Sequence, residues 1–157
     1  MDRITLIEKI VSGAQTGVDR AALDVALKLG ISSGGWCPKG RRAEDGPIDK
    51  RYPLKETSSE DYSLRTKQNV RDSDGTLILT VGEPTGGTAL TRTHVETLGK
   101  PCLVIDLNQK PTAETVHDWI RTHSIQILNV AGPRASQQPE IYEKATQFLT
   151  DLFQSHP

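Results

Sequence analysis

Short apolar runs alternate with longer amphipathic stretches along this chain of 157 residues, and this alternation constrains the fold more than any other feature. Alternating strands and helices are typical of a parallel β-sheet with helices packed against it. Strands buried on both faces consist mainly of Val, Ile and Leu, without a regular polar alternation. Four such runs and a weaker one (33–37) predict strands at residues 9–12, 33–37, 76–81, 102–107 and 125–130.

The stretches between these runs have apolar residues at helical spacing. The first has an apolar stripe that begins at Val18 and ends at Leu29. Thr16, with Asp19 three residues later, has the spacing of a capping box, and Gly30 suits the left-handed position that ends a helix. We therefore predict helices at residues 17–29, 60–72, 88–98, 113–123 and 140–153.

These elements predict an α/β fold: a doubly wound, mostly parallel, five-stranded Rossmann-like sheet with helices on both faces. We expect one domain over residues 1–157, since domains commonly have about 100–200 residues. In the common strand order 2-1-3-4-5, the loops after the first and third strands would be neighbours at the edge where open α/β sheets bind ligands. Residues 38–58 are rich in Pro, Gly and charge and too long for a tight connection, which predicts a functional loop.

Composition excludes several classes of function. Nineteen Lys and Arg against 20 Asp and Glu give a net charge of −1, so nothing favours nucleic acid or an anionic membrane as partner. Cys37 and Cys102 form no CxxC pair and have no His nearby in sequence, which excludes a disulfide scaffold and the standard zinc spacings. There is no signal-peptide pattern and no run of about 18 apolar residues. We therefore expect a cytoplasmic protein with no membrane or nucleic-acid partner.

Ten of the 13 glycines fall within or just beyond the carboxyl ends of predicted strands, and two glycine-rich loops lead directly into a helix. Glycine lets the backbone approach a ligand closely, and the free N–H groups of a helix start favour an anion, typically phosphate. Neither loop has the Walker pattern or the GxGxxG pattern of NAD-binding proteins; a tight turn remains the alternative for the first loop. The predicted binding residues are Gly13, Ala14, Gln15, Thr16, Gly17, Asp19 and Arg20, and, in the second loop, Thr85, Gly86, Gly87 and Thr88.

Cations near these loops support the prediction. Residues 39–71 hold nine Lys or Arg and six Asp or Glu, and we predict ligand contacts there from Pro38, Lys39, Gly40 and Arg41, with Trp36 able to stack on a ring. Arg20 and Arg92 lie near the start of their helices, where the helix dipole disfavours a cation. A bound anion would explain this placement, and so would ion pairs with Asp24 and Glu96, four residues further on.

Weaker candidates come from two other segments. Thr66 and Asn69, one turn apart on a predicted helix, face either the site or water. Arg134 follows the last strand and is a further candidate for contact with an anion. The chain has no GxSxG or HExxH motif, no suggestive pair of carboxylates and no nucleophile beside a base. The residues therefore predict a binding site for a phosphorylated compound and identify no catalytic group.

Four segments, in order along most of the chain, match a known family. They are SGAQTGVDRAALD (12–24), GWCPKGR (35–41), NVRDSDGT (69–76) and TGGT (85–88). The sequence resembles the family named "putative molybdenum carrier", which is grouped with Rossmann-like nucleotide-binding proteins that include the LOG phosphoribohydrolases and were often labelled lysine decarboxylases. The resemblance implies a doubly wound α/β fold. It also implies an anionic ligand across the glycine loops, such as the molybdenum cofactor (molybdopterin), whose pterin carries a phosphate, or a nucleotide.

One departure from the relatives bears on activity. The phosphoribohydrolases carry PGGxGTxxE, whose glutamate serves catalysis, whereas residues 85–91 read TGGTALT and have no glutamate three residues after Thr88. The phosphate-binding part is kept and the catalytic carboxylate is missing, unless Glu83 or Asp19 substitutes for it.

We therefore expect a binding or carrier protein for a phosphate-bearing, ring-containing small molecule. A nucleotide-processing hydrolase of the phosphoribohydrolase type is the alternative, so the sequence leaves open whether the protein is an enzyme. A homodimer or higher homo-oligomer is also expected, because small doubly wound domains often pair through their helices.

Overall fold

The structure is a computed structural model that describes residues 7–154. Its central five-stranded sheet consists of β1 (Lys9–Val11), β2 (Ser32–Gly34), β7 (Gly75–Thr80), β8 (Cys102–Asp106) and β9 (Ile127–Ala131). Neighbouring strands pair in parallel throughout this sheet. The α-helices within the described residues are α1 (Val18–Leu29), α2 (Tyr62–Arg71), α3 (Gly86–Thr97), α4 (Ala113–Thr122) and α5 (Ile141–Gln154). All five predicted helices are thus confirmed.

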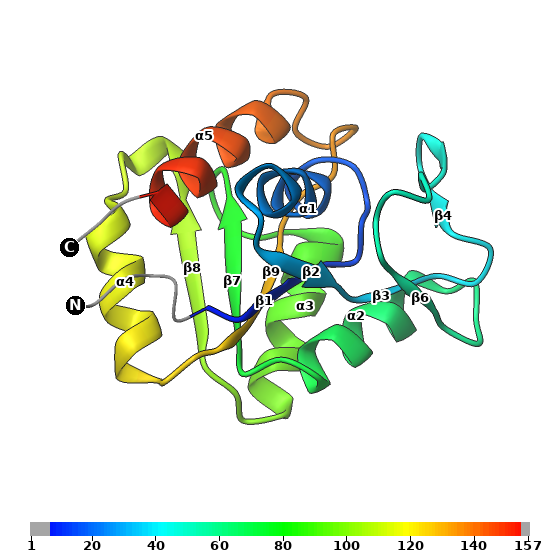
Figure 1. Cartoon of the computed structure of the whole chain (residues 1–157), viewed down its shortest axis with the longest axis horizontal. Helices are drawn as coiled ribbons and strands as arrows, with labels where there is room; N and C mark the ends of the chain where they lie inside the picture. The colour runs from blue at the N-terminus through cyan, green and yellow to red at the C-terminus, as the bar shows by residue number, and fades with distance from the viewer. Residues whose placement is uncertain (1–6, 155–157) are drawn as a thin grey trace.

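Helices cover both faces of the sheet, as the predicted doubly wound α/β fold requires. Helices α1, α4 and α5 pack together on one face, and α2 and α3 lie on the other (Figure 1). All six residues of β7 are buried, which explains why this strand has no polar alternation. Leu77 and Leu79 from β7 join Leu128 and Val130 from β9 in the main apolar core.

The strand order is β2-β1-β9-β7-β8, so the order 2-1-3-4-5 is wrong. The last strand along the chain inserts between β1 and β7, because the right-handed crossover through α4 carries the chain from β8 back past β7. Counted from β9, the order becomes 3-2-1-4-5, which is the Rossmann order without its sixth strand. The loop after β9 therefore separates the two glycine-rich loops at the carboxyl edge.

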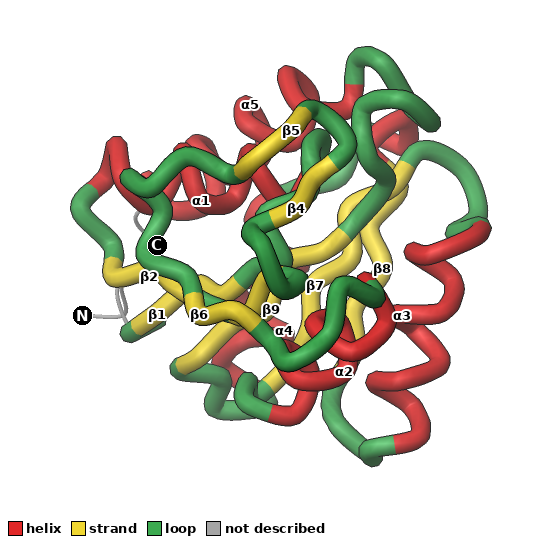
Figure 2. Tube along the Cα trace, turned by 90° about the vertical axis from the view of Figure 1, so that its right-hand side faces the viewer, coloured by secondary structure: helices red, strands yellow, loops and turns green. Residues whose placement is uncertain are grey.

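The strand predicted at 33–37 is divided at Gly35, whose φ is 126°. Its second part, β3 (Trp36–Cys37), leaves the main sheet and pairs with β6 (Lys55–Glu56). Between them, β4 (Arg42–Ala43) and β5 (Gly46–Pro47) form a short antiparallel hairpin, shown in Figure 2. The predicted long loop thus contains small strands of its own.

A second apolar cluster anchors this segment on α1. It consists of Ala14, Leu23, Cys37, Ile48 and Tyr52, which are all buried. The guanidinium of Arg41 donates hydrogen bonds to the carbonyl oxygens of three residues in the segment, namely Ile48, Asp49 and Tyr52. The base of the segment is therefore fixed by both apolar and polar contacts.

The capping box predicted at the start of α1 is wrong. The cap is Gly17, with φ 79°, and no side chain caps the helix. The hydroxyl of Thr16 instead accepts a hydrogen bond from the distant amide of Ala135. The helix end is as predicted, with Gly30 in the left-handed conformation. No helix within residues 7–154 combines the length and the apolar composition needed to cross a membrane.

Candidate functional site

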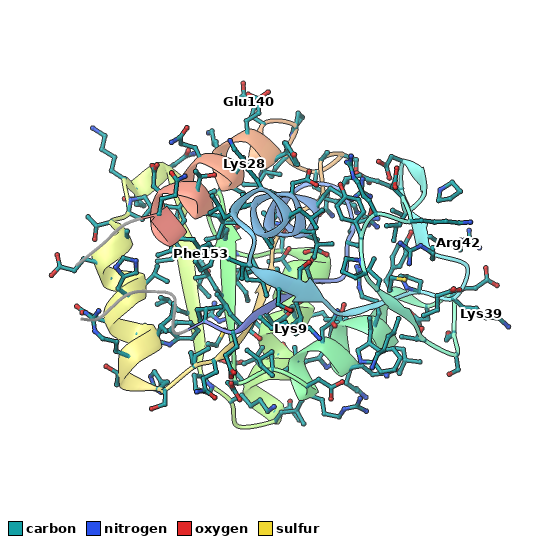
Figure 3. All side chains as sticks on the ribbon, in the orientation of Figure 1. Lys9, Lys28, Lys39, Arg42, Glu140 and Phe153 are labelled. Carbon is teal, nitrogen blue, oxygen red and sulfur yellow. The ribbon has the colours of Figure 1, made fainter. Side chains whose placement is uncertain are left out.

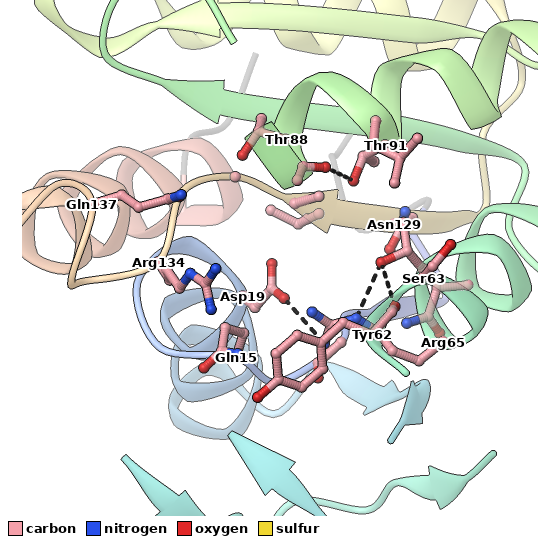
Figure 4. A pocket seen from close by; sticks show the side chains of 18 residues that line it. Gln15, Asp19, Tyr62, Ser63, Arg65, Thr88, Thr91, Asn129, Arg134 and Gln137 are labelled. Atoms are coloured by element: carbon pink, nitrogen blue, oxygen red, sulfur yellow. Dashed lines mark hydrogen bonds and ion pairs between the residues drawn. The ribbon is translucent and has the colours of Figure 1, made fainter. Parts of the chain in front are cut away.

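A cavity of about 120 Å³ opens at the carboxyl edge of the sheet. Four segments supply its polar lining (Figure 4): the loop after β1 with the first turn of α1, helix α2, the first turns of α3, and β9 with the loop that follows it. The residues used below are Gly13, Gln15, Asp19, Arg65, Thr66, Asn69, Gly87, Thr88, Thr91, Asn129, Gly132, Arg134 and Gln137. The cavity thus lies where the strand order reverses, between β9 and β7, as expected for a ligand site in an open α/β sheet.

A buried ion pair forms one wall of the cavity. Nη1 of Arg65 lies 3.7 Å from Oδ2 of Asp19, and both side chains are only 10% exposed. The same Nη1 donates a hydrogen bond of 2.6 Å to the carbonyl oxygen of Gly13. A Cβ at position 13 would lie 2.2 Å from this nitrogen. A side chain at position 13 would therefore displace the guanidinium of Arg65 from its contacts with Gly13 and Asp19.

Asp19 has an unusual pKa for a carboxyl group. Burial raises the pKa to about 6, although Arg65 and the backbone N–H groups of Gln15 and Gly132 act to lower it. Such a group changes its charge near neutral pH, and perturbed carboxyls in cavities are common at functional sites. Asp19 can therefore accept or donate a proton at the site.

The start of α3 forms the opposite wall. Thr85 is the cap, but its side chain makes no capping hydrogen bond. The N–H of Thr88 donates to the carbonyl oxygen of Thr85 (3.1 Å), whereas the N–H groups before it have no partner within the helix. Gly87 and Thr88 line the cavity. A Cβ at Gly87 would meet no atom within 4 Å, so this glycine leaves the helix end open. The wall therefore presents the unhindered N–H of Gly87 and the positive end of the helix dipole.

Gln15 is 5% exposed and lines the cavity. Its Oε1 accepts hydrogen bonds from the N–H groups of Thr16 (3.0 Å) and Glu44 (2.8 Å). Its Nε2 is buried and has no hydrogen-bond partner among the described residues. An unsatisfied buried donor costs about 1–3 kcal/mol. The amide is therefore suited to an acceptor atom on a ligand.

Several predicted residues lie beside the cavity rather than in its lining. Arg20 donates to the carbonyl oxygen of Ala14 and to both carboxylate oxygens of Asp45. The pair with Asp24 weighed from the sequence is not the one formed. Arg92 does form an ion pair with the residue four positions further on, since its Nε lies 3.9 Å from Oε2 of Glu96.

The segment 38–41 lies away from the cavity lining. Lys39 and Gly40 are exposed, and Figure 3 shows Lys39 and Arg42 at the outer end of their segment. Pro38 is buried, and Arg41 binds backbone carbonyls as described above. None of these four predicted residues lines the cavity.

Trp36 is held by helix α2 and is not in the cavity lining. Its indole N–H donates to Asp72 (2.8 Å), and its backbone exchanges two hydrogen bonds with the side chain of Asn69. Asn69 and Thr66 both line the cavity. This answers the question that the sequence left open about these two residues.

The sequence did not identify Arg65, Asn129 or Gln137 as site residues. Arg65 lies one residue before Thr66 and one turn before Asn69, which is the only signal it carries. Asn129 lies inside an otherwise apolar strand and donates to Thr76 on the neighbouring strand. A buried amide in a central strand is an indicator that could have been used.

No group of three or more His, Cys, Asp or Glu within residues 7–154 is arranged to hold a metal ion. Cys37 lies in the second apolar cluster, and burial raises the pKa of its thiol. Neither Cys37 nor Cys102 lines the cavity. The described part of the site is therefore a set of hydrogen-bond donors, two arginines and one carboxyl group.

Comparison with known proteins agrees with the fold. The crystal structure named "Putative molybdenum carrier protein", from Syntrophus aciditrophicus SB, is 49% identical over 96% of each chain, with a TM-score of 0.91. No curated protein matches the chain. The model of the family described as "Circularly permutated YpsA SLOG family" matches residues 10–153, and a permutation accounts for a Rossmann order that is recovered by counting from β9. The chain belongs to the circularly permuted YpsA SLOG family.

Proposed function

We propose that this protein binds a small molecule that carries a phosphate group and a ring, and that the phosphate lies against the start of α3. One observation carries the proposal: the open helix start at Gly87 and the unpartnered amide of Gln15 line the same cavity. Arg65 and Arg134 also line it, against the single carboxylate of Asp19. The donors and the excess of positive charge both favour an anion.

The size of the cavity suggests how much of the ligand it encloses. The cavity has a volume of about 120 Å³. Ligand pockets for whole drug-sized molecules are larger, about 300–1,000 Å³. We therefore expect the enclosed part to hold the phosphate end, with the ring at the mouth.

Molybdopterin is the ligand that we put first, in a carrier role without turnover. The similar crystal structure bears the name of a molybdenum carrier, and a pterin phosphate would suit the N–H of Gly87 and the side chain of Thr88, which line the cavity. The described residues offer no cluster of metal ligands, so the metal would be carried by the dithiolene group of the pterin as cargo. A nucleotide has the same combination of phosphate and ring and is the second ligand to test.

Calorimetric titration with molybdopterin, a panel of nucleoside monophosphates and inorganic phosphate tests the proposal. The Gly87→Asp variant adds a carboxylate at the helix start, where the structure has room for it. Apposed like charges cost several kcal/mol, so we expect binding to weaken by about 100-fold or more. The control is Thr93→Asp, which adds the same charge on an exposed residue of the same helix. Absence of saturable binding by the wild type, or equal weakening in both variants, would contradict the proposal.

Asp19 supports a second candidate, a phosphoribohydrolase-type enzyme. The carboxyl lines the cavity and has a pKa of about 6, whereas Glu83 is exposed and outside the lining. In such a reaction Asp19 would take a proton from the attacking water, whose oxygen bonds to the ribose carbon as the base departs with the electron pair of the broken C–N bond. The proton held by Asp19 would then pass to the departing base. Incubation with nucleoside monophosphates should then release free base, and Asp19→Asn should abolish the release. No release across the panel would eliminate this candidate.

A further inference from the structure

The carboxylate of Glu44 lies in a cluster of hydrogen-bond donors at the rim of the cavity. Ser136 donates to it through its hydroxyl (2.6 Å) and through its backbone N–H (3.1 Å). The hydroxyl of Thr16 also donates to it, and Nε of Arg134 lies 3.8 Å away. Burial raises the pKa of Glu44, but the hydrogen bonds from Ser136 and Thr16 lower it by more than burial raises it. The pKa therefore lies below its usual value.

These donors come from two loops that are far apart in sequence. Thr16 follows β1, and Arg134 and Ser136 follow β9. The N–H of Ala135 donates to the hydroxyl oxygen of Thr16 (3.0 Å), which directs the hydroxyl proton towards Glu44. Hydroxyl, backbone N–H and guanidinium donors are the groups that bind phosphate oxygens in proteins. Glu44 therefore occupies a site whose chemistry suits a phosphate equally well.

The cluster is continuous with the cavity. Arg134 and Gln15 line the cavity, and the backbone N–H of Glu44 donates to Oε1 of Gln15. The other end of this amide is the buried Nε2 that has no partner among the described residues. One side chain thus connects the unsatisfied donor inside the cavity with the acidic residue at its rim.

The β4–β5 hairpin is attached at its tip by polar contacts. None of residues 42–47 is buried, and the tip is held by Glu44 as described and by the pair between Asp45 and Arg20. The buried apolar anchors, Ile48 and Tyr52, belong to the base of the segment, and of the hairpin only Ala43, which is partly buried, packs against the same cluster. The tip can therefore move away from the rim without exposing a buried apolar side chain.

We infer that Thr16, Arg134 and Ser136 form a second anion subsite, and that Glu44 is an internal occupant which a ligand phosphate displaces. The inference rests on the proposed function and extends the ligand class to compounds with two phosphate groups, such as a diphosphate. The first phosphate binds at the start of α3, and the second replaces the Glu44 carboxylate and releases the hairpin tip. Ligands with one phosphate leave Glu44 in place.

Titration with inorganic pyrophosphate and with inorganic phosphate, followed by amide NMR, tests this inference. Glu44→Gln keeps the shape and removes the competing charge, so we expect pyrophosphate to bind about tenfold more tightly or better, with a clear shift of the Ser136 amide. Glu44→Ala should give the same gain, and adding Ser136→Ala to Glu44→Gln should remove it. Asp45→Asn is the matched control, because it removes one charge from the same tip but none from the subsite.

The outcomes separate the two proposals. An equal gain in Asp45→Asn would show that net charge is responsible and would overturn the subsite. A shift of the Gly87 amide without any gain in Glu44→Gln would overturn the subsite and leave phosphate binding at α3 intact. If pyrophosphate shifts the amide resonance of Ser136 in Glu44→Gln but leaves that of Gly87 unchanged, the result would support the subsite and contradict the binding mode proposed for α3.

Discussion

Ionisation of the buried carboxyl of Asp19 opposes folding, and the Asp19→Asn variant measures by how much. Burial raises the pKa from 3.8 to about 6, so the folded protein binds this proton more tightly than the unfolded chain does. The resulting stability is fully present below the unfolded pKa and is lost as pH rises through the folded one. One pKa unit corresponds to about 1.4 kcal/mol. The whole shift then amounts to about 3 kcal/mol, of which about 2 kcal/mol is lost between about pH 4.5 and about pH 7.

Urea unfolding of the wild type and of Asp19→Asn across this pH range is the assay. The wild-type free energy of unfolding, minus that of the variant, should fall by about 2 kcal/mol from about pH 4.5 to about pH 7. The comparison cancels the titration of the groups that both proteins share. Asp45→Asn is a control whose difference should hardly change over this range, because the hydrogen bonds from Arg20 lower the pKa of Asp45 and its effect on stability is confined to pH values below about 5. A difference that stays constant or rises with pH for Asp19→Asn would refute the reasoning.

Three further predictions concern the backbone, the core and the site. Gly17 and Gly30 both have positive φ, but of these two only Gly17 has a backbone oxygen, that of Pro133, 2.2 Å from the position of an added Cβ. Denaturation should show that the free energy of unfolding falls by about 1–2 kcal/mol in Gly30→Ala and by about 2–5 kcal/mol in Gly17→Ala. Equal losses in the two variants would contradict this. Leu128→Ala truncates a fully buried side chain in the central strand and should lower the free energy of unfolding by about 2–5 kcal/mol. A loss below about 1 kcal/mol would mean that the side chain of Leu128 is not closely packed in the folded protein. Sulfate binding near Asp19 should raise the pKa of this residue further, so calorimetry near about pH 6.5 in buffers of different ionisation enthalpy should show proton uptake, which Asp19→Asn should remove.

Local signals explain why the helices could be predicted from the sequence. The stripe from Val18 to Leu29 and the terminal Gly30 act within one helix, and α1 has the expected bounds within one residue at its start. The same holds for the buried run of β7, which needs no distant partner to be recognised as a strand. Such elements depend on residues within a few positions of one another, which periodicity detects.

Contacts between distant residues explain what the sequence could not predict. Thr16 was expected to cap α1, but its hydroxyl is used by Glu44 and Ala135 instead. The place of Arg65 depends on Gly13, 52 residues away in the chain. In the same way, nothing in the run Ile127–Ala131 distinguishes a central strand from an edge strand. The site prediction therefore included residues of loops that line the cavity and left Thr66 and Asn69 of α2 as open candidates, but it missed Arg65.

The position of β9 has a consequence for how the molecule is assembled. During synthesis the strand in the middle of the sheet is the last of the five to be made, after both of its neighbours. Until it is in place, the pairs β2–β1 and β7–β8 have no strand to join them, and β1 and β7 each present an unpaired edge. Closing the sheet must then wait for contacts of long sequence separation, which slow folding. A nascent chain that ends before residue 127 should therefore be prone to aggregate, and chaperones would act on this protein late in its synthesis.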